Sequence, residues 1–491
     1  MNNEADDVTI IESATCLGCG CACDDISVVV RGGRIVEARN ACHLGVKWFG
    51  DGTVSTGVTV RGESVPVERA LDEASALLGG ARRALVYLAP DISCEAQRAA
   101  VALADQLHAV VDNITSSTAA AGTLAAQRRG RASATLGEVR NRADVLVFWG
   151  VDPAERYPRY LTRYAPDPAG VFVPGGRSDR TVIAVDVGDE HGPADADVRI
   201  AIAPGDEPTA IAMLRATLAG RGPALGDAGK GGDAGKAGDT GKAGDAAKAG
   251  AIGNPGETAN TGTTRTTGTT GTTGNADPVA RTADTPTATQ PLAELALILA
   301  GARYAVVVYD AEPGKREHPG RAESLIALTQ ELNATIRCSL STLRGGGNRG
   351  GAETVMTWQT GFPMTVDYSR GAPRYRPDEG AAALLERGAV DVVLIVGNAR
   401  AAGVPDLGEA RCVAIGPWSS QFTPAREVAI DTGVAGIHEG GLAYRMDDIP
   451  LPLRPSLPGP AAAPDTAALL AALGARLRAR TQQGTSEGGS K

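Results

Sequence analysis

Apolar positions along the chain repeat with two different periods, and the two patterns alternate from about residue 66. Residues 67–80 (VERALDEASALLGG) place apolar side chains three and four positions apart and end in two glycines, which predicts an amphipathic helix. The same pattern predicts helices over 94–109, 294–301 and 324–334. Continuous apolar runs, typical of buried strands, occupy residues 84–89, 144–150, 180–188, 304–310, 390–398 and 412–416. This exchange of helix and strand predicts the α/β class, with several doubly wound parallel-sheet domains.

The N-terminal 60 residues follow another pattern. Residues 26–31 (ISVVVR) and 34–38 (RIVEA) are alternating segments on either side of Gly32 and Gly33, a sequence suited to a two-residue turn. They predict a hairpin within a small, cysteine-rich β domain over residues 1–60.

A low-complexity segment interrupts the alternation over residues 221–290. Glycine recurs at every third position from Gly226 to Gly244, and a Thr/Gly run follows. Neither composition can bury a core, so we expect a flexible linker. Two α/β domains are then predicted on either side of it, over 61–220 and 291–475, with a disordered tail over 476–491.

Composition narrows the function classes. The chain has 491 residues, of which 43% are hydrophobic, so it can build several cores. Its net charge of −9 argues against a nucleic-acid-binding protein, which needs a basic face. No stretch of about 18 uncharged apolar residues occurs, and the acidic start MNNEADDVTI does not resemble a signal peptide. We therefore expect a soluble cytoplasmic protein.

Five of the eight cysteines lie close to the N-terminus, at Cys16, Cys19, Cys21, Cys23 and Cys42. In a reducing compartment such a group indicates metal binding rather than disulfides. The spacing Cys16-x2-Cys19-x3-Cys23, with Cys42 returned by the hairpin as a fourth thiolate, suits a 4Fe–4S cluster. Cys21 is then surplus, which leaves the choice of ligands ambiguous.

Two other interpretations of this loop stay open. A structural zinc site would prefer two CxxC pairs, and only Cys16 and Cys19 clearly form one. A metal-free loop is the other. The remaining cysteines are expected to be small buried hydrophobes; they are Cys94, Cys338 and Cys412.

Several long strings together resemble one family. They are CLGCGCACDD at 16–25, residues 135–160 (TLGEVRNRADVLVFWGVDPAERYPRY), 356–380 (MTWQTGFPMTVDYSRGAPRYRPDEG) and 438–454 (HEGGLAYRMDDIPLPLR). On these strings the chain resembles the B subunit of formylmethanofuran dehydrogenase, within the molybdopterin oxidoreductase superfamily. The resemblance covers nearly everything outside the linker and the tail.

The resemblance implies a fold and a set of cofactors. In redox members, this B subunit carries one 4Fe–4S cluster and a molybdenum or tungsten ion held by two pterin dinucleotides between α/β domains. A cysteine or selenocysteine ligates the metal. Here the corresponding string reads DNITSSTAAAG (112–122), so that Thr118 stands at the ligand position and Ala119 replaces the usual histidine. Because a Thr hydroxyl is a poor substitute for a thiolate, we expect molybdopterin or tungstopterin to be absent and no residue of this chain to be catalytic.

Five residues are candidates for binding a cofactor. Gly150 and Asp152 follow a predicted strand where the superfamily contacts a pterin, and an ordinary strand-ending turn is the other explanation for them. Arg159 could pair with a dinucleotide phosphate or with a surface carboxylate. Asp186 resembles the acid that holds a nucleotide ribose, or it caps the next element. Asn348 is retained in the string LRGGGNRGG, which has lost the family's aromatic and His character.

The expected function follows from the missing ligand. Some aerobic methylotrophs contain a related formyltransferase/hydrolase complex whose B subunit has lost the metal ligand. The resemblance therefore implies a non-redox B subunit in tetrahydromethanopterin-linked oxidation of formaldehyde to formate, which holds A, C and D-type subunits and a methanofuran-like carrier. No HExxH motif or serine nucleophile elbow occurs, so hydrolysis would belong to a partner. The alternatives are a redox-active B subunit of formylmethanofuran dehydrogenase, which interconverts CO2 plus methanofuran and formylmethanofuran, and a stand-alone regulatory module.

Overall fold

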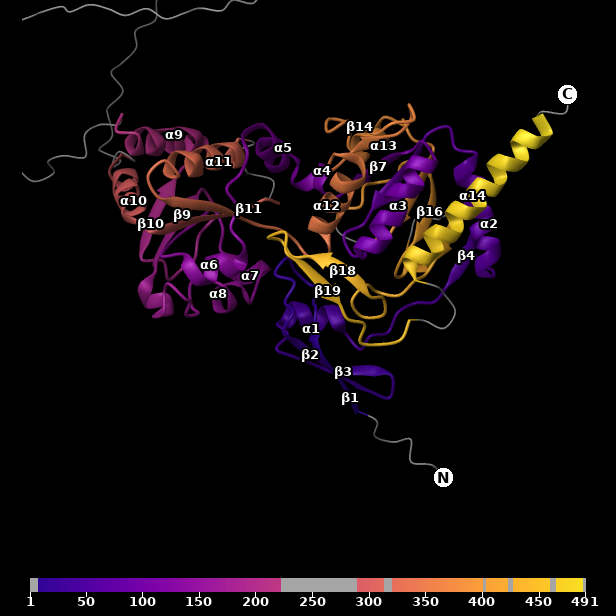
Figure 1. The fold of residues 1–491 in the computed structure, drawn as a ribbon, viewed down its shortest axis with the longest axis horizontal. Helices are drawn as coiled ribbons and strands as arrows, with labels where there is room; N and C mark the ends of the chain where they lie inside the picture. Colours follow the sequence, from indigo (N-terminus) through magenta and orange to yellow (C-terminus); the bar gives the residue numbers. More distant parts are fainter. Residues whose placement is uncertain are drawn as a thin grey trace, which may run out of the picture. The chain divides into compact units, whose positions relative to one another are not determined.

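The computed structural model describes residues 8–221, 289–312, 320–400, 403–422, 427–459 and 465–488. These residues form two large sheets, a three-stranded N-terminal sheet and a two-stranded hairpin (Figure 1). Nearly all of the predicted 221–290 linker lies outside the described residues. Among the described helices, none combines the length and the apolar character that crossing a membrane requires.

The N-terminal sheet is antiparallel and contains β1 (Val8–Ala14), β2 (Ile26–Arg31) and β3 (Arg34–Arg39). Arg31 pairs with Arg34, so the predicted hairpin is confirmed. Gly32 and Gly33 close it with φ of 56° and 73°, values that a side chain would disfavour. The short helix α1 (His43–Phe49) follows and begins directly after Cys42.

The five-stranded sheet is parallel, with strand order β10-β9-β8-β11-β12. Its strands are β8 (Val145–Trp149), β9 (Thr181–Val187), β10 (Val198–Ile202), β11 (Tyr304–Asp310) and β12 (Arg337–Leu343). Alternate side chains serve opposite faces, so that Val147 packs with the core beneath α9 (Glu207–Leu218), α10 (Thr289–Gly301) and α11 (Arg321–Leu332), as Figure 1 shows. Leu146 and Phe148 pack on the other face, in the core that also contains the N-terminal cysteines. The short elements on that side are α6 (Leu136–Arg142), α7 (Pro153–Arg156), α8 (Tyr160–Arg163) and η1 (Gly176–Asp179).

The nine-stranded sheet has five parallel central strands and antiparallel edges, in the order β14-β13-β7-β6-β15-β16-β17-β4-β5. Its strands are β4 (Val58–Val60), β5 (Glu63–Ser64), β6 (Ala84–Leu88), β7 (Val110–Asn113), β13 (Val366–Asp367), β14 (Arg374–Tyr375), β15 (Val392–Val396), β16 (Arg411–Ile415) and β17 (Val428–Ile430). The helices of the core on one face are α2 (Val67–Gly79), α3 (Cys94–Gln106), α12 (Arg349–Thr360) and α14 (Thr466–Gly488). The other face packs against α13 (Ala381–Glu386). The remaining elements are α4 (Thr115–Thr118), α5 (Ala120–Arg129), η2 (Pro204–Asp206), η3 (Ser419–Gln421) and the hairpin β18 (Gly441–Tyr444) with β19 (Pro450–Leu453).

Strand pairing differs from the predicted division into domains over 61–220 and 291–475. Each large sheet combines strands from both segments, since β8 pairs with β11 and β6 pairs with β15. The predicted N-terminal domain over 1–60 also ends differently, because β4 joins the nine-stranded sheet. Local apolar patterns identify strands but carry no information on which strand becomes the neighbour.

The predicted disordered tail over 476–491 is wrong for its described part. Helix α14 continues to Gly488 and buries Leu473 and Leu477 against the core that includes α2 and α3. Arg476 forms ion pairs with Glu68 and Asp72 of α2. The apolar residues four positions apart along α14 explain why the helix extends past residue 476.

Candidate functional site

A cavity of about 350 Å³ lies where the ends of β11 and β12 meet α5 and α12. Strand β7 leads into α4 and α5 at the same place, so the cavity sits at the carboxyl ends of parallel strands, where ligands bind in such folds. Its lining residues are Ala119, Gly122, Thr123, Ala126, Gln127, Arg131, Tyr309, Ala311, Thr342, Arg344, Glu353, Thr357, Gly361, Pro363, Met446 and Asp448.

Thr118 lies beside this cavity, at the end of α4. Its hydroxyl donates a hydrogen bond of 2.9 Å to the carbonyl of Ile114 in the preceding turn. The next residue, Ala119, lines the cavity, and the described lining contains no cysteine. The side chain predicted to replace the metal ligand of redox members is therefore bonded to the backbone of its own turn.

A buried ion-pair network crosses the cavity wall. Arg344 lies directly after β12. It donates a hydrogen bond of 2.6 Å to Glu353 on α12 and one of 3.1 Å to the hydroxyl of Thr115 on α4. The Thr115 hydroxyl in turn donates 2.5 Å to Glu353. Burial acts to lower the pKa of Arg344, but Glu353 and Glu312 raise it above the usual arginine value. The network links the five-stranded sheet to the nine-stranded one.

Glu312, directly after β11, extends the network. It pairs with Arg349 at 2.6 Å and accepts 2.9 Å from the backbone N–H of Gly345. Its Oε1 lies 3.8 Å from the Nε of Arg344, and neither of these buried atoms has a hydrogen-bond partner within the described part of the chain. On the cavity lining, burial raises the pKa of Asp448, and Arg131 at 3.7 Å opposes this shift.

This cavity does not fit a metal held by two pterin dinucleotides. A volume of about 350 Å³ suits one small ligand. Its charged lining residues are two arginines and two carboxylates (Arg131, Arg344, Glu353 and Asp448), which provides no net positive charge for several phosphates. The described lining offers no thiolate to a metal. No reaction step at such a group can be derived from the residues present.

The N-terminal cysteines form a second, separate constellation. The loop before β2 folds back on itself, with the N–H of Cys16 donating 2.9 Å to the carbonyl of Cys23 and that of Ala22 donating 3.1 Å to the carbonyl of Cys19. The N–H of Gly18 points at the sulfur of Cys16, 3.4 Å away. Cys16, Cys19, Cys21 and Cys23 are buried, and Cys42 at the start of α1 is half-buried.

The thiols are close enough to influence one another. Burial raises the pKa of Cys16, and the charges of Cys19, Cys23 and Cys42 raise it further. A hydrogen bond from Cys21 lowers the pKa of Cys19. Among the described residues, no three His, Cys, Asp or Glu side chains converge on one point that could hold a metal ion. A zinc ion needs its four sulfurs about 2.3 Å from one centre, whereas a four-iron cluster binds each thiolate to a separate iron, so the donor set suits a cluster better than a single ion.

The five predicted cofactor-binding residues are not brought together, and the described lining of the cavity includes none of them. Gly150 adopts φ of 58° after β8, with buried Arg321 and Glu190 beside it. Asp152 caps α7 by accepting 2.9 Å from the N–H of Ala154. Both residues thus serve the turn that follows their strand.

Asp186, Asn348 and Arg159 each have partners within the chain. Asp186 accepts from Arg199 at 2.7 Å and from the N–H of Gly192 at 2.9 Å. Asn348 is fully buried and bonds the backbone of Ile92 and Tyr444, which ties α12 to α3 and β18. Arg159 forks Asp25 and lies at the cysteine loop. Their assignment to a cofactor stays a prediction.

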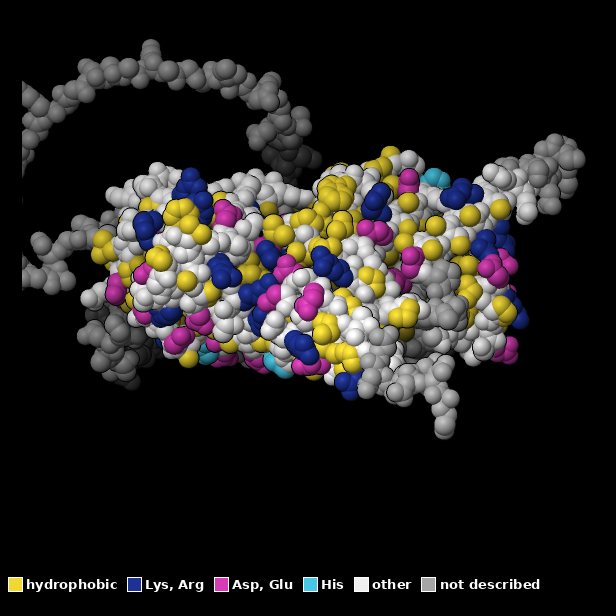
Figure 2. All heavy atoms as spheres, turned by 60° about the horizontal axis from the view of Figure 1, so that its bottom comes forward, with side chains coloured by type: hydrophobic (Ala, Val, Ile, Leu, Met, Phe, Trp, Pro, Cys, Tyr) yellow, Lys and Arg dark blue, Asp and Glu magenta, His cyan; other side chains and the backbone are white. Residues whose placement is uncertain are grey.

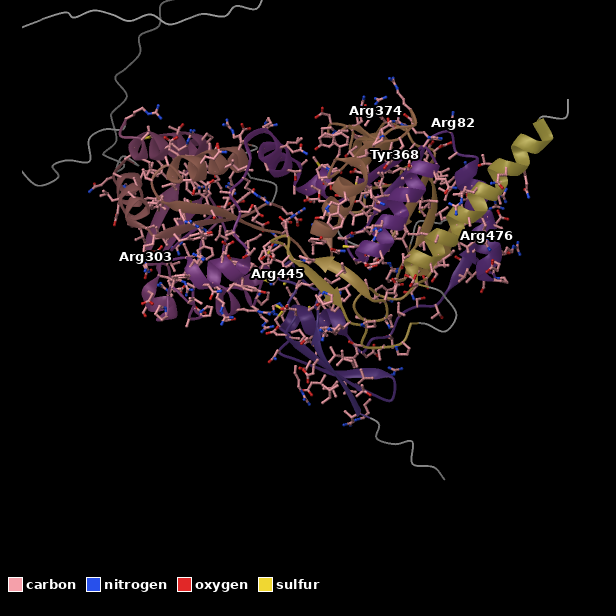
Figure 3. The ribbon with its side chains drawn as sticks, in the orientation of Figure 1. Arg82, Arg303, Tyr368, Arg374, Arg445 and Arg476 are labelled. Carbon is pink, nitrogen blue, oxygen red and sulfur yellow. The ribbon has the colours of Figure 1, made fainter. Side chains whose placement is uncertain are left out.

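Sequence reasoning missed the residues that make both constellations distinctive. Thr115, Glu353 and Glu312 stand out in no motif, because each gains its role only when separate strands meet at the cavity. Arg445 was also missed; it pairs with Asp447 at 2.6 Å, and its guanidinium lies 5.5 Å from the ring centre of Tyr164. Figure 3 shows Arg445 at the turn between β18 and β19.

Comparisons with known proteins place the chain in a family. No family model matches the sequence. The chain is 30% identical over 467 residues to the B subunit of the tungsten-containing formylmethanofuran dehydrogenase 2 of Methanocaldococcus jannaschii, covering 91% of this chain and 94% of that relative. The counterpart from Methanococcus maripaludis is 28% identical, with coverage of 92% and 95%.

A solved structure is similar in fold. A chain of the formyltransferase/hydrolase complex (FhcABCD) from Methylorubrum extorquens, crystallised with methylofuran, aligns with a TM-score of 0.62 at 21% identity, covering 87% of this chain and 99% of that one. That identity supports a shared fold only. The 30% identity over nine-tenths of the M. jannaschii protein supports more: this chain belongs to the family of formylmethanofuran dehydrogenase B subunits.

Proposed function

We propose that this chain is the B subunit of a cytoplasmic formyltransferase/hydrolase complex in tetrahydromethanopterin-linked one-carbon metabolism. Its fold would be that of the molybdopterin oxidoreductases, without the metal–pterin cofactor. It would act as a non-redox scaffold that holds A, C and D-type subunits and a methanofuran-like carrier. The fold similarity to a chain of FhcABCD in complex with methylofuran supports this assignment.

The state of the cavity is the observation that carries the proposal. Thr118 is hydrogen-bonded to its own helix, and the described lining of the cavity holds no thiol. Arg344 and Glu353 line the cavity, and both are hydrogen-bonded to Thr115 behind them. These groups do not suit a soft metal or its dinucleotides, so transfer and hydrolysis of the formyl group would take place on partner subunits.

The cysteine loop would hold a 4Fe–4S cluster on Cys16, Cys19, Cys23 and Cys42 as a structural staple. Such a cluster would join the N-terminal sheet to α1 and to the core of the five-stranded sheet, in which Cys16, Cys19 and Cys23 are packed. Metal–thiolate bonds can supply folding free energy without electron transfer.

A redox-active formylmethanofuran dehydrogenase subunit is the second candidate. Two observations favour it: both relatives from the methanogens are named as tungsten-containing enzymes, and the cysteine set of the N-terminal loop is complete.

One purification and two assays separate these functions. The tagged chain, isolated anaerobically from its native host, should retain A, C and D-type subunits, release formate from the N-formylated carrier, and leave a viologen dye unreduced when formate is supplied. Dye reduction that depends on formate would overturn the scaffold in favour of the oxidoreductase. Isolation of the chain alone would instead indicate a free-standing module.

A further inference from the structure

Two arginine side chains extend to the cysteine loop: Arg159, which directly precedes α8, and Arg163, the last residue of α8. Both terminal nitrogens of Arg159 donate hydrogen bonds to the carboxylate of Asp25, at 2.7 and 2.6 Å. Arg163, one helical turn later, donates 2.7 Å to Asp25 and 2.5 Å to Asp24. Both aspartates follow Cys23 directly in the sequence, so the pairs fix the position of the loop at Cys23, one of its predicted ligands.

The charges of the same arginines act on a nearby sulfur. Both guanidinium groups lie close enough to Cys23 for their positive charges to favour its thiolate. The neighbouring Tyr164 donates 3.4 Å to the carbonyl of Cys21, and the guanidinium of Arg163 lies 5.3 Å from the centre of its ring. The arginine side chains are only 21% and 17% exposed. They are therefore held in place by packing before any cofactor binds.

The charges around the loop show what these contacts would do. Two guanidinium groups face two carboxylates, so the four side chains cancel and the thiolates decide the net charge of the loop. A cluster on four thiolates is anionic and becomes more so when it is reduced. Hydrogen-bond donors and positive charge at the sulfur atoms stabilise the reduced form and make the potential less negative.

We propose that Arg159 and Arg163 are positioning residues for an iron–sulfur cluster on Cys16, Cys19, Cys23 and Cys42, and that they raise its reduction potential through Cys23. The inference rests on the cluster in the proposed function. It also assigns Arg159 a role different from phosphate binding, because both of its terminal nitrogens are bonded to Asp25 and its charge acts on Cys23.

The test compares three substitutions in the full-length chain, purified anaerobically with its partners. Arg159→Gln and Arg163→Gln remove one positive charge each. Arg163→Lys keeps the charge but cannot bond Asp24 and Asp25 with two separate nitrogens. The matched control is Arg177→Gln. Both terminal nitrogens of Arg177 donate hydrogen bonds to the carboxylate of Asp197, at 2.8 and 3.0 Å, so this variant breaks the same kind of ion pair away from the cysteine loop. The readouts are iron per chain, the rate of iron loss to a chelator, and the midpoint potential followed by electron paramagnetic resonance.

We expect both Gln variants to shift the midpoint potential to more negative values and to lose iron about 10–100-fold faster than wild type. Arg163→Lys should have a midpoint potential close to that of wild type but should lose iron faster. Arg177→Gln should match wild type in midpoint potential and in the rate of iron loss. A loaded wild type whose Gln variants keep the control's potential would overturn the role of the arginines and leave the cluster intact. A wild type without iron would overturn the cluster itself.

Discussion

The cysteine loop and the cavity after β7 differ in the groups that they offer to a cofactor. The loop keeps its thiols together, buried, and braced by two arginines from another part of the chain. The cavity has Thr118, the predicted counterpart of a metal ligand, beside it and an internal ion-pair network in its wall. If the proposed function is right, one region keeps a set of metal-binding thiols while the other lacks one, and cluster binding would be separate from catalysis within one fold.

Removing two thiols should have the largest effect on this comparison. The double substitution Cys19→Ala/Cys42→Ala should abolish iron binding and lower the free energy of unfolding by about 4 kcal/mol or more, because the staple would be lost. The matched control is Cys94→Ala/Cys338→Ala, two buried thiols elsewhere, which should keep the iron and cost about 1 kcal/mol per site. Iron assay and urea unfolding measure both. Equal losses in the two double variants would show that the loop carries no staple.

Breaking the cavity network should have the next largest effect. Arg344→Met would leave Glu353 and Glu312 buried without this cation, and should cost about 3–5 kcal/mol in urea unfolding while the iron content stays unchanged. The double substitution Arg344→Met/Glu353→Leu should recover part of that loss. A single variant as stable as wild type would contradict a network that joins the two sheets.

A rise in pH should change the stability contributed by the two regions in opposite directions. Beside the cavity, burial raises the pKa of Asp310 to about 6 despite its pair with Arg156, so its contribution to stability is present below about pH 4 and is lost as the pH rises through 6. Asp310→Asn should therefore gain stability relative to wild type between pH 5 and 8, on the order of 2 kcal/mol.

In the cysteine loop the sign is reversed. Burial acts to raise the pKa of Asp25, but the hydrogen bond from Arg159 and the charge of Arg163 lower it below the usual value. Its contribution is present at neutral pH and is lost as the pH falls through the folded-state pKa, so Asp25→Asn should be destabilising at pH 7 and progressively less so as the pH falls below about 4. Urea unfolding across this pH range measures both variants, and slopes of the same sign would contradict the contrast.

The smallest effect is expected from Thr118→Cys. The substitution removes one hydrogen bond to Ile114 and should change stability by less than about 1 kcal/mol. Because the network and the neutral lining remain, the variant should still contain no molybdenum or tungsten by elemental analysis. Stoichiometric metal in this variant would show that the missing ligand alone separates this chain from the redox enzymes.

Much of the fold could be predicted from local pattern. The runs at 84–89, 144–150, 180–188, 390–398 and 412–416 are strands β6, β8, β9, β15 and β16, and the hairpin at Gly32 and Gly33 is present. Each of these depends on neighbouring residues only. The pairing of β8 with β11 and of β6 with β15 joins residues more than 150 positions apart, and no periodicity encodes it.

The sites show the same limit. The cysteine spacing identified the thiols, and the string around Thr118 identified the altered ligand position, because both signals are contiguous. Arg159 was recognised as a residue that binds an anion, but its partner Asp25 lies 134 positions earlier. Figure 2 shows basic and acidic side chains intermixed over one face of the chain. Because both signs of charge are spread over the surface, the composition could not indicate which arginine forms an ion pair with which carboxylate.

Elemental analysis of the anaerobically purified native complex for iron, molybdenum, tungsten and zinc tests the central claim most directly. The account predicts about four irons per chain, as expected for one 4Fe–4S cluster, with no molybdenum or tungsten. Stoichiometric molybdenum or tungsten would contradict it and make this chain the oxidoreductase subunit.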